Sequence, residues 1–212
     1  LYWIAGLSML FGNILALLQS SIKRLLAYSS IAQFGYLMVA FIAISELAGR
    51  HLAIEAAVFF LIAYFITTIG AFGVVTIMSD KSEDHDLDSL DAYEGLFWQR
   101  PLLAAFMSIM LLSLAGIPLT AGFIGKFYIL ASGVESQLWP LLVIVVIGSG
   151  IGLFYYLRVI YAMTKKAAAN TDIKVSAAGG WTMAVVTLVL LVLGVYPAPV
   201  IEWVSNMALQ LV

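Results

Sequence analysis

The stretch LSLAGIPLTAGFIGKFYIL, residues 112–130, is apolar enough to lie within a membrane, yet it contains two features that a simple membrane helix avoids. A Gly-Ile-Pro sequence at Gly116–Pro118 interrupts it, and a single lysine, Lys126, follows eight residues after the proline. Proline lacks an amide hydrogen and clashes with the preceding turn, and glycine lowers helix propensity, so a helix breaks at such a sequence. A helix break beside a buried charge predicts a functional site.

The composition of the chain indicates a membrane protein. Of its 212 residues, 63% are hydrophobic and 10% are charged, whereas soluble domains carry about 25% charged residues. A net charge of -2 without a basic patch argues against nucleic-acid binding. The 212 residues contain no cysteine, which excludes within them a disulfide, a thiolate metal site and a thiol nucleophile. Motifs of soluble enzymes such as the P-loop, HExxH and GxSxG are also missing.

Six stretches are long and apolar enough to cross a bilayer, which takes about 20 residues per helix. They predict an all-α, polytopic membrane helix bundle with six transmembrane helices, one of them discontinuous. The fourth span would be about 51 Å long as a straight helix, far more than the hydrocarbon thickness, so we place its break at Gly116–Pro118. Unwound backbone at this depth needs protein or water as partners, which predicts a hydrated interior nearby. The predicted spans cover residues 2–19, 28–45, 53–78, 101–134, 139–163 and 180–204.

Lysine and arginine residues gather at one end of the predicted bundle. Only Arg50 lies near the other end, in the second connection. Because loops rich in Lys and Arg stay in the cytoplasm, the first connection (SSIKRLLA, residues 20–27), the third and the fifth are predicted to be cytoplasmic. With six crossings, both ends of the chain then lie on the opposite side. The cations at the predicted cytoplasmic end are Lys23, Arg24, Lys81, Arg100, Arg158, Lys165, Lys166 and Lys174.

The long third connection, DKSEDHDLDSLDAYEGLFWQRP at residues 80–101, holds seven of the twelve acidic residues. Its simplest interpretation is a solvated acidic loop. Leu87, Leu90 and Phe97 also fit a short amphipathic helix that lies on the membrane face or on a partner. A third alternative is a cation site, since oxygen ligands are present, although their spacing matches no known cation-binding loop. That site would use Asp84, His85, Asp86 and Asp88.

Polar side chains form a stripe at helical spacing on each of two predicted spans. The stripes consist of Ser29, Gln33 and Tyr36 on the second span and of Tyr64, Thr67 and Thr68 on the third. They fit interhelical hydrogen bonds that hold a bundle together, and they also fit a hydrated path. The run GSGIG at Gly148–Gly152 lies inside an apolar span, so close helix packing explains it better than a nucleotide site.

Lys126 favours the hydrated path. Along a helix it lies about 13.5 Å from Glu135, the next acidic residue, which places it near mid-membrane and makes Glu135 a candidate for the outer part of the path. An ionised lysine at the centre of a bilayer costs about 2.5–3.5 kcal/mol, so the side chain is expected to face a cavity. A lysine nearer the helix end would extend to the headgroups instead. Burial favours the uncharged amine, and an amine that exchanges its proton can relay one.

The segments SSIKRLLAYSSIAQFGYLMVA (residues 20–40) and AGIPLTAGFIGKFYIL (residues 115–130) resemble the antiporter-like membrane subunits of proton-pumping NADH:quinone oxidoreductase, respiratory complex I. The resemblance extends over essentially the whole chain and includes EGLFWQRP at residues 94–101. Such subunits contain two inverted five-helix repeats, each with a discontinuous fourth helix. Residues 1–163 would then form the second repeat, and residues 164–212 a cytoplasmic connection and a closing transmembrane helix. The first repeat would precede Leu1, which lacks the features of a natural start.

The resemblance also implies roles for individual residues. Lys126 would be the protonatable lysine of a half-channel, with Gly116 and Pro118 shaping its broken helix and the polar stripes lining the route. Gln33 occupies a position where relatives carry histidine or glutamine, so no titrating role follows for it. The chain would move protons in a bacterial inner membrane, coupled to quinone reduction elsewhere in a complex. It would bind no redox cofactor, metal or nucleic acid, and its partners would be lipid and other membrane subunits, including neighbouring antiporter-like subunits.

Two alternative functions stay open on the sequence. A subunit of a multisubunit sodium/proton antiporter would share the broken helix and the lysine, and sodium-dependent exchange in vesicles would distinguish it. A membrane scaffold that moves no ion would keep the helix bundle but would tolerate neutralisation of Lys126.

Overall fold

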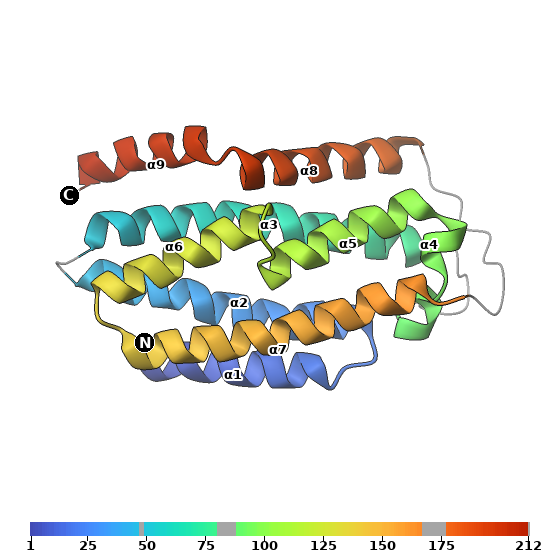
Figure 1. Ribbon diagram of the computed structural model, residues 1–212, viewed down its shortest axis with the longest axis horizontal. Coiled ribbons are helices and arrows are strands. Elements are labelled where there is room, and N and C mark those ends of the chain that lie inside the picture. The colour runs from blue at the N-terminus through green and yellow to red at the C-terminus, as the bar shows by residue number, and fades with distance from the viewer. Residues whose placement is uncertain (47–48, 80–87, 167–176, 212) are drawn as a thin grey trace.

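Helices make up almost all of the computed structural model, which describes residues 1–46, 49–79, 88–166 and 177–211 (Figure 1). This confirms the predicted all-α class. The helices are α1 (Tyr2–Leu17), α2 (Ile22–Ser45), α3 (Arg50–Ser79), the 3₁₀ helix η1 (Leu90–Tyr93), α4 (Leu96–Gln99), α5 (Pro101–Ala115), α6 (Ala121–Glu135), α7 (Trp139–Thr164), α8 (Ala177–Val195) and α9 (Ala198–Leu211). Among the described residues, α2, α3, α7 and α8 are long and apolar enough to cross a membrane, and α1 and α5 are shorter apolar helices.

The long helices lie side by side along one direction, with α1 and α7 in one layer and α8 and α9 on the opposite side of the bundle (Figure 1). Helices α1 and α2 pack closely against each other, and two glycines permit this contact. A Cβ atom at Gly12 would lie 2.6 Å from the backbone nitrogen of Ala32, and one at Gly35 would lie 2.9 Å from that of Met9. Small residues at such crossings let helix backbones pack directly in an apolar environment. As a result α2 is the central helix, with most of its residues buried.

Helix α2 begins six residues earlier than the predicted second span, so the prediction of residues 20–27 as a connection was wrong for most of that segment. Ser21 is its N-cap, and the Ser21 hydroxyl accepts a hydrogen bond from the backbone nitrogen of Arg24. This bond satisfies one of the free amide groups that every helix start exposes. Lys23 and Arg24 therefore lie in the first turn of α2. Both residue types are good helix formers, although they are not apolar.

The third connection contains short helices rather than only a loop. Helices η1 and α4 lie against the end of α7, where the indole nitrogen of Trp98 donates to the carbonyl of Thr164 at 2.9 Å and Lys165 pairs with Glu94 at 2.7 Å. Asp88, one of the predicted cation ligands, instead accepts a hydrogen bond from the Ser21 hydroxyl at 2.7 Å. The other three candidates, and Leu87 of the predicted amphipathic helix, lie outside the described residues.

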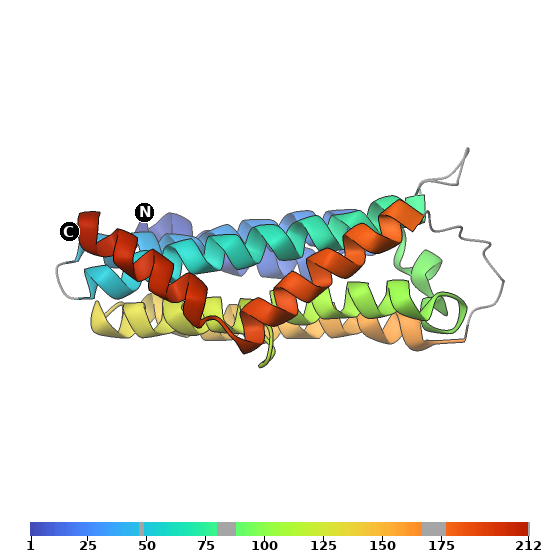
Figure 2. The ribbon, with the colours of Figure 1, turned by 90° about the horizontal axis from the view of Figure 1, so that it is seen from above.

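The predicted fourth span comprises two helices, α5 and α6, separated by residues 116–120. The predicted sixth span is likewise two helices, α8 and α9, which meet at Tyr196 and Pro197 and form a V in Figure 2. The prediction of residues 180–204 as one continuous span was therefore wrong. Pro197 explains this second break because it cannot donate a helix hydrogen bond. The apex of the V lies against the α5–α6 connection, where a Cβ at Gly194 would be 2.5 Å from the carbonyl oxygen of Leu119.

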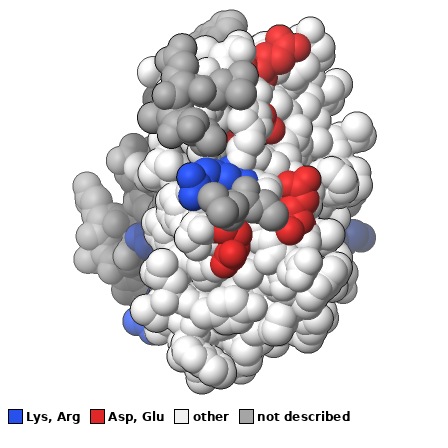
Figure 3. All heavy atoms as spheres, turned by 90° about the vertical axis from the view of Figure 1, so that its left-hand side faces the viewer, with Lys and Arg blue, Asp and Glu red and all other residues white. Residues whose placement is uncertain are grey.

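Charged side chains differ between the two ends of the bundle. One end carries the α2–α3 and α6–α7 connections, with Glu46, Glu135 and Glu202 and one described cation, Arg50. Figure 3 looks onto this end and shows a basic patch near its centre with acidic side chains beside it. The guanidinium of Arg50 donates to the carbonyl of Ile44 at 3.1 Å and so caps the end of α2. The described cations of the predicted cytoplasmic end, Lys23, Arg24, Arg100, Arg158, Lys165 and Lys166, lie at the other end.

Candidate functional site

The amino group of Lys126 lies inside the bundle, at the end of α5. Its nitrogen donates hydrogen bonds to the carbonyl oxygens of Leu114 at 2.8 Å and Ala115 at 3.1 Å. Only 8% of the residue is exposed. The side chain therefore reaches back from the second turn of α6 to the last turn of α5 and does not extend to the surface. The C-terminal end of a helix carries a partial negative charge, so this position stabilises an ammonium group.

Gly116 leaves these two carbonyls free for the lysine. Helix α5 ends in a Schellman motif: the backbone nitrogen of Ile117 bonds to the carbonyl of Leu112, and the nitrogen of Gly116 bonds to the carbonyls of Leu112 and Ser113. The motif requires a left-handed residue, and Gly116 has φ of +84°. No backbone amide bonds to the carbonyls of Leu114 and Ala115 within this motif, so Lys126 supplies their donor.

Gly116 also makes room for the lysine side chain. A Cβ atom at this position would lie 2.9 Å from Cδ of Lys126 and 3.6 Å from its amino nitrogen. Two independent requirements, a positive φ and close contact with Lys126, thus call for glycine here. Pro118 lies two residues further on in the unwound segment and is exposed, so the end of α5 is set by Gly116 and the proline follows it.

Ser113 connects both sides of the break to α3. Its hydroxyl accepts a hydrogen bond from the backbone nitrogen of Gly122 at 3.1 Å and lies 3.2 Å from the hydroxyl of Thr67. A Cβ atom at Gly122 would clash with the carbonyl oxygen of Ser113. Helices α5 and α6 therefore meet through direct contact of their backbones. Ser113 was not among the predicted site residues, although a serine three residues before the Gly-Ile-Pro break, in a mostly apolar span, was a usable signal.

Gln33 binds the same carbonyl as Lys126. Its amide nitrogen donates to the oxygen of Leu114 at 3.1 Å, so this predicted path residue helps to cap α5. Gln33, Tyr64, Thr67 and Ser113 also line a small space beside Lys126. Residues from the two predicted stripes thus come together at the lysine: Gln33 of the first stripe and Tyr64 and Thr67 of the second line this space.

The aromatic ring of Tyr36 lies beneath the ammonium group, with the lysine nitrogen 5.1 Å from the ring centroid. This is within the range of a cation–π interaction, which stabilises a positive charge by about 2 kcal/mol where water is excluded. The Tyr36 hydroxyl accepts a hydrogen bond from the amide nitrogen of Asn13 at 2.9 Å, and the hydroxyl of Tyr155 donates to the amide oxygen of Asn13 at 3.0 Å. Asn13 therefore fixes the orientation of Tyr36.

Asn13 was not among the predicted site residues. It is 1% exposed, and it joins α1, α2 and α7 in one network. An amide in the middle of an apolar span was the signal, because polar residues within membrane spans generally face the bundle interior. The predicted packing role of GSGIG also becomes specific: a Cβ at Gly148 would lie 2.8 Å from the Tyr36 hydroxyl, and one at Gly152 would lie 3.4 Å from the Asn13 amide oxygen.

Three predicted path residues, Ser29, Thr68 and Glu135, do not line the small space beside Lys126. The Ser29 hydroxyl bonds to the carbonyl of Leu26 in its own helix at 2.8 Å. Thr68 and Ser29 line a second small space, separate from the space at Lys126. Glu135 is exposed at the end of α6. Within residues 1–46, 49–79, 88–166 and 177–211, no three His, Cys, Asp or Glu side chains are grouped in a way that could hold a metal ion.

Comparison with known proteins identifies the family. Residues 1–152 match the family described as "NADH:quinone oxidoreductase/Mrp antiporter, TM". The chain belongs to this family. One relative is the NADH-quinone oxidoreductase subunit N of Ectopseudomonas mendocina (strain ymp). It is 54% identical over 211 residues, which cover 97% of this chain and 42% of the relative. The chain thus spans about two fifths of the length of this relative.

Two solved structures contain chains with the same fold. A chain of respiratory complex I from Thermus thermophilus, in a structure with bound aureothin, is 31% identical with a TM-score of 0.82 over 95% of this chain and 44% of that chain. A chain of the Mrp complex from Dietzia sp. DQ12-45-1b superposes with a TM-score of 0.83 over 98% of this chain and 46% of that chain. At 17% identity the Mrp chain shows the shared fold alone.

Proposed function

We propose that this chain is part of a proton-translocating membrane subunit of an NADH:quinone oxidoreductase, and that Lys126 carries the proton. The observation behind this proposal is the position of the lysine: its amino group is buried at the junction of α5 and α6, where it donates to the carbonyls of Leu114 and Ala115. The relatedness at 54% identity to an NADH-quinone oxidoreductase subunit N supports the choice of complex.

The site can hold the lysine in its charged form. Two carbonyls at the negative end of α5 and the face of the Tyr36 ring surround the ammonium group. These groups replace part of the water that the cation loses when it enters the bundle. All of them are fixed in place by the Schellman motif at Gly116 and by the Asn13 hydrogen bonds. Protonation of Lys126 thus adds charge at a prepared position.

Release of the proton turns the ammonium into a neutral amine, which needs less stabilisation by the carbonyls. One N–H bond breaks and the proton passes to a water molecule or hydroxyl in the space lined by Gln33, Tyr64, Thr67 and Ser113. The reverse step restores the ammonium. In this scheme α5 and α6 are the halves of one discontinuous transmembrane helix, and the unwound residues 116–120 provide the free carbonyls at membrane depth.

The redox chemistry takes place on other subunits in this proposal, and this chain contacts lipid and neighbouring membrane subunits in a bacterial inner membrane. It crosses the bilayer six times, with α8 and α9 together forming the sixth crossing. The end with Lys23, Arg24, Arg158, Lys165 and Lys166 faces the cytoplasm. The path residues Ser29 and Thr68 line a neighbouring space that also borders Leu114, and Glu135 is exposed at the end of α6, so these three would line other parts of the route.

Substitution of Lys126 tests the proposal in the full-length subunit, assembled in its complex and reconstituted into vesicles. Arginine keeps the positive charge but, with a pKa above about 12, does not release its proton at working pH. Alanine removes both the charge and the proton. We expect both Lys126→Arg and Lys126→Ala to assemble, and both to lower the proton translocation rate at least about tenfold.

Lys166→Arg and Lys166→Ala serve as matched controls, because Lys166 is exposed at the end of α7, and both should translocate protons normally. A Lys126→Arg variant that assembles and translocates protons at the wild-type rate would overturn the proposal. It would leave Lys126 as a fixed charge that caps α5.

A further inference from the structure

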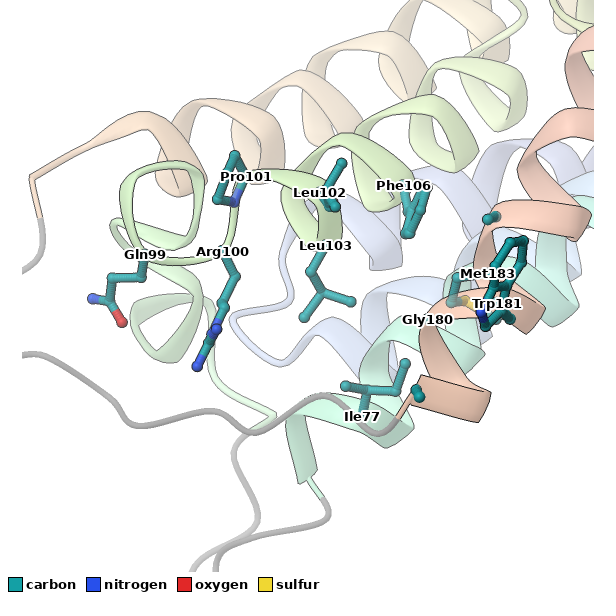
Figure 4. A pocket seen from close by; sticks show the side chains of 12 residues that line it. Ile77, Gln99, Arg100, Pro101, Leu102, Leu103, Phe106, Gly180, Trp181 and Met183 are labelled. Atoms are coloured by element: carbon teal, nitrogen blue, oxygen red, sulfur yellow. The ribbon is translucent and has the colours of Figure 1, made fainter.

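An apolar groove lies between α5, α8 and the end of α3, far from Lys126 along α5. Its volume is about 500 Å³, which is within the range of about 300–1,000 Å³ that is typical of small-molecule sites. Figure 4 shows Leu103 and Phe106 of α5 on one side and Trp181 and Met183 of α8 on the other. No part of this groove takes part in the proposed proton site.

Polar groups are confined to one end of the groove. Within the described ranges, the polar or charged side chains that line it are Gln99 and Arg100, at the junction of α4 and α5 (Figure 4). No carboxylate lines the groove, and Arg100 makes no ion pair with a carboxylate in the described part of the chain. Among the described residues, the groove therefore has a long apolar section and one positive charge, Arg100, at one end with no carboxylate paired to it.

We propose that this groove binds one anionic phospholipid, with a phosphate group at Arg100 and an acyl chain along Leu103, Phe106 and Met183. The groove is amphipathic in the same way as a lipid. Its cation would meet the lipid phosphate at one end, and its apolar walls would meet the acyl chain along the rest. Trp181 lies on the groove wall with three quarters of its surface exposed, and tryptophan prefers the depth of the headgroups in a membrane.

The charge of Arg100 decides the class of lipid. A guanidinium binds phosphate oxygens with two parallel hydrogen bonds, and near a membrane surface one basic residue favours an anionic lipid by a factor of about five. Arg100 lies at the same end of the bundle as Lys23, Arg158 and Lys165, which is the predicted cytoplasmic end. The bound lipid thus belongs to the cytoplasmic leaflet, where anionic headgroups are concentrated.

Photolabelling with lipids tests this site in the intact complex that contains the full-length subunit. The complex is reconstituted with phosphatidylglycerol or phosphatidylcholine that carries a diazirine in the acyl chain, irradiated, and digested for mass spectrometry. We expect label on peptides that contain Leu103–Phe106 and Trp181–Ala184 in the wild-type protein. The anionic lipid should label them about fivefold more than the zwitterionic lipid.

Three variants separate the headgroup contact from the acyl-chain contact. Arg100→Gln should abolish the preference for phosphatidylglycerol and leave labelling by phosphatidylcholine unchanged. Ala184→Phe narrows the groove and should reduce labelling by both lipids. Lys166→Gln, which removes a cation at the same end of the bundle but outside the groove, should keep the fivefold preference.

Several outcomes would overturn the proposal, and two of them need only the wild-type complex. Equal labelling by both lipids would mean that the groove holds bulk lipid without selection. No labelling would mean that another protein segment fills the groove. Retention of the fivefold preference in Arg100→Gln, or its loss in Lys166→Gln, would assign the selectivity to a different site. Assembly of each variant is checked by native electrophoresis before labelling.

Discussion

The amino nitrogen of Lys126 lies 2.8 Å from the carbonyl oxygen of Leu114, twelve residues earlier in the chain. This single hydrogen bond links α6 to the end of α5 across the unwound residues 116–120. The break therefore does more than shorten a helix that is too long for the membrane. It produces backbone carbonyls that have no backbone amide partner, and these carbonyls hold the lysine inside an apolar bundle.

Gly116 and Pro118 should differ sharply in their effects when each is replaced by alanine. Alanine at position 116 must adopt a left-handed conformation, which costs about 1–2 kcal/mol, and its Cβ would press on the Lys126 side chain. We expect Gly116→Ala to lower both the thermal stability of the subunit and the proton translocation rate. Pro118→Ala should leave both nearly unchanged, because Pro118 is exposed and follows a helix end that is already capped.

The comparison needs equal assembly of the two variants, which sedimentation of the detergent-solubilised complex can establish. If Pro118→Ala stops proton translocation while Gly116→Ala does not, the proline and not the Schellman motif maintains the break.

Replacement of Gly194 by alanine should lower the stability of the fold. Gly194 allows the α8–α9 junction to pack against the α5–α6 connection. A Cβ there would lie 2.5 Å from the Leu119 carbonyl oxygen, and overpacking of this kind costs about 1–3 kcal/mol. Gly150 provides the control, since nothing lies within 4 Å of its added Cβ. Alanine in an open helical position stabilises by about 0.5–1 kcal/mol relative to glycine. Thermal unfolding should therefore occur at a lower temperature in Gly194→Ala and at an unchanged or higher temperature in Gly150→Ala.

Equal melting temperatures for these two variants would show that the contact between Gly194 and the α5–α6 connection does not contribute to stability.

Asn13 should couple energetically to Tyr155. Asn13→Leu leaves the hydroxyls of Tyr36 and Tyr155 without their shared partner, and an unsatisfied buried polar group costs about 1–3 kcal/mol. In a Tyr155→Phe background one of these hydroxyls is already absent, so the same substitution should destabilise less. A double-mutant cycle on the unfolding of the subunit measures this difference, which we expect to be about 1 kcal/mol. Strict additivity of the two substitutions would contradict the network.

Impermeant thiol reagents should label opposite ends of the bundle from opposite sides of the membrane. The 212 residues contain no cysteine, so single cysteines introduced into them report unambiguously on their position in this part of the chain. Lys166→Cys lies at the end rich in Lys and Arg and should react only from the cytoplasmic side. Glu46→Cys is exposed at the other end and should react only from outside. The reversed pattern would invert the proposed orientation.

Much of the helical architecture follows from the sequence, because the length and apolarity of each helix are local properties of the chain. A run of about 20 apolar residues must satisfy its backbone hydrogen bonds internally in a bilayer, and a helix does so without help from distant residues. The Gly-Ile-Pro sequence predicted the interruption near Gly116, because its effect on helix formation is also local. The free energy needed to place a charge in the membrane marked Lys126 as an unusual residue. The early start of α2 escaped detection because Lys23 and Arg24 suit a helix but not a membrane interior.

Only the tertiary structure decided which groups surround the lysine. Asn13 reaches Tyr155 across 142 residues of chain, and Gln33 reaches Leu114 across 81, so no local pattern could pair them. Ser29 and Thr68 had the same helical spacing as Gln33 and Thr67 but point to a separate space. The second break at Pro197 likewise gained its importance through contact of Gly194 with Leu119. Local sequence sets where a helix can form or break, whereas the carbonyl that a side chain meets depends on how the helices pack.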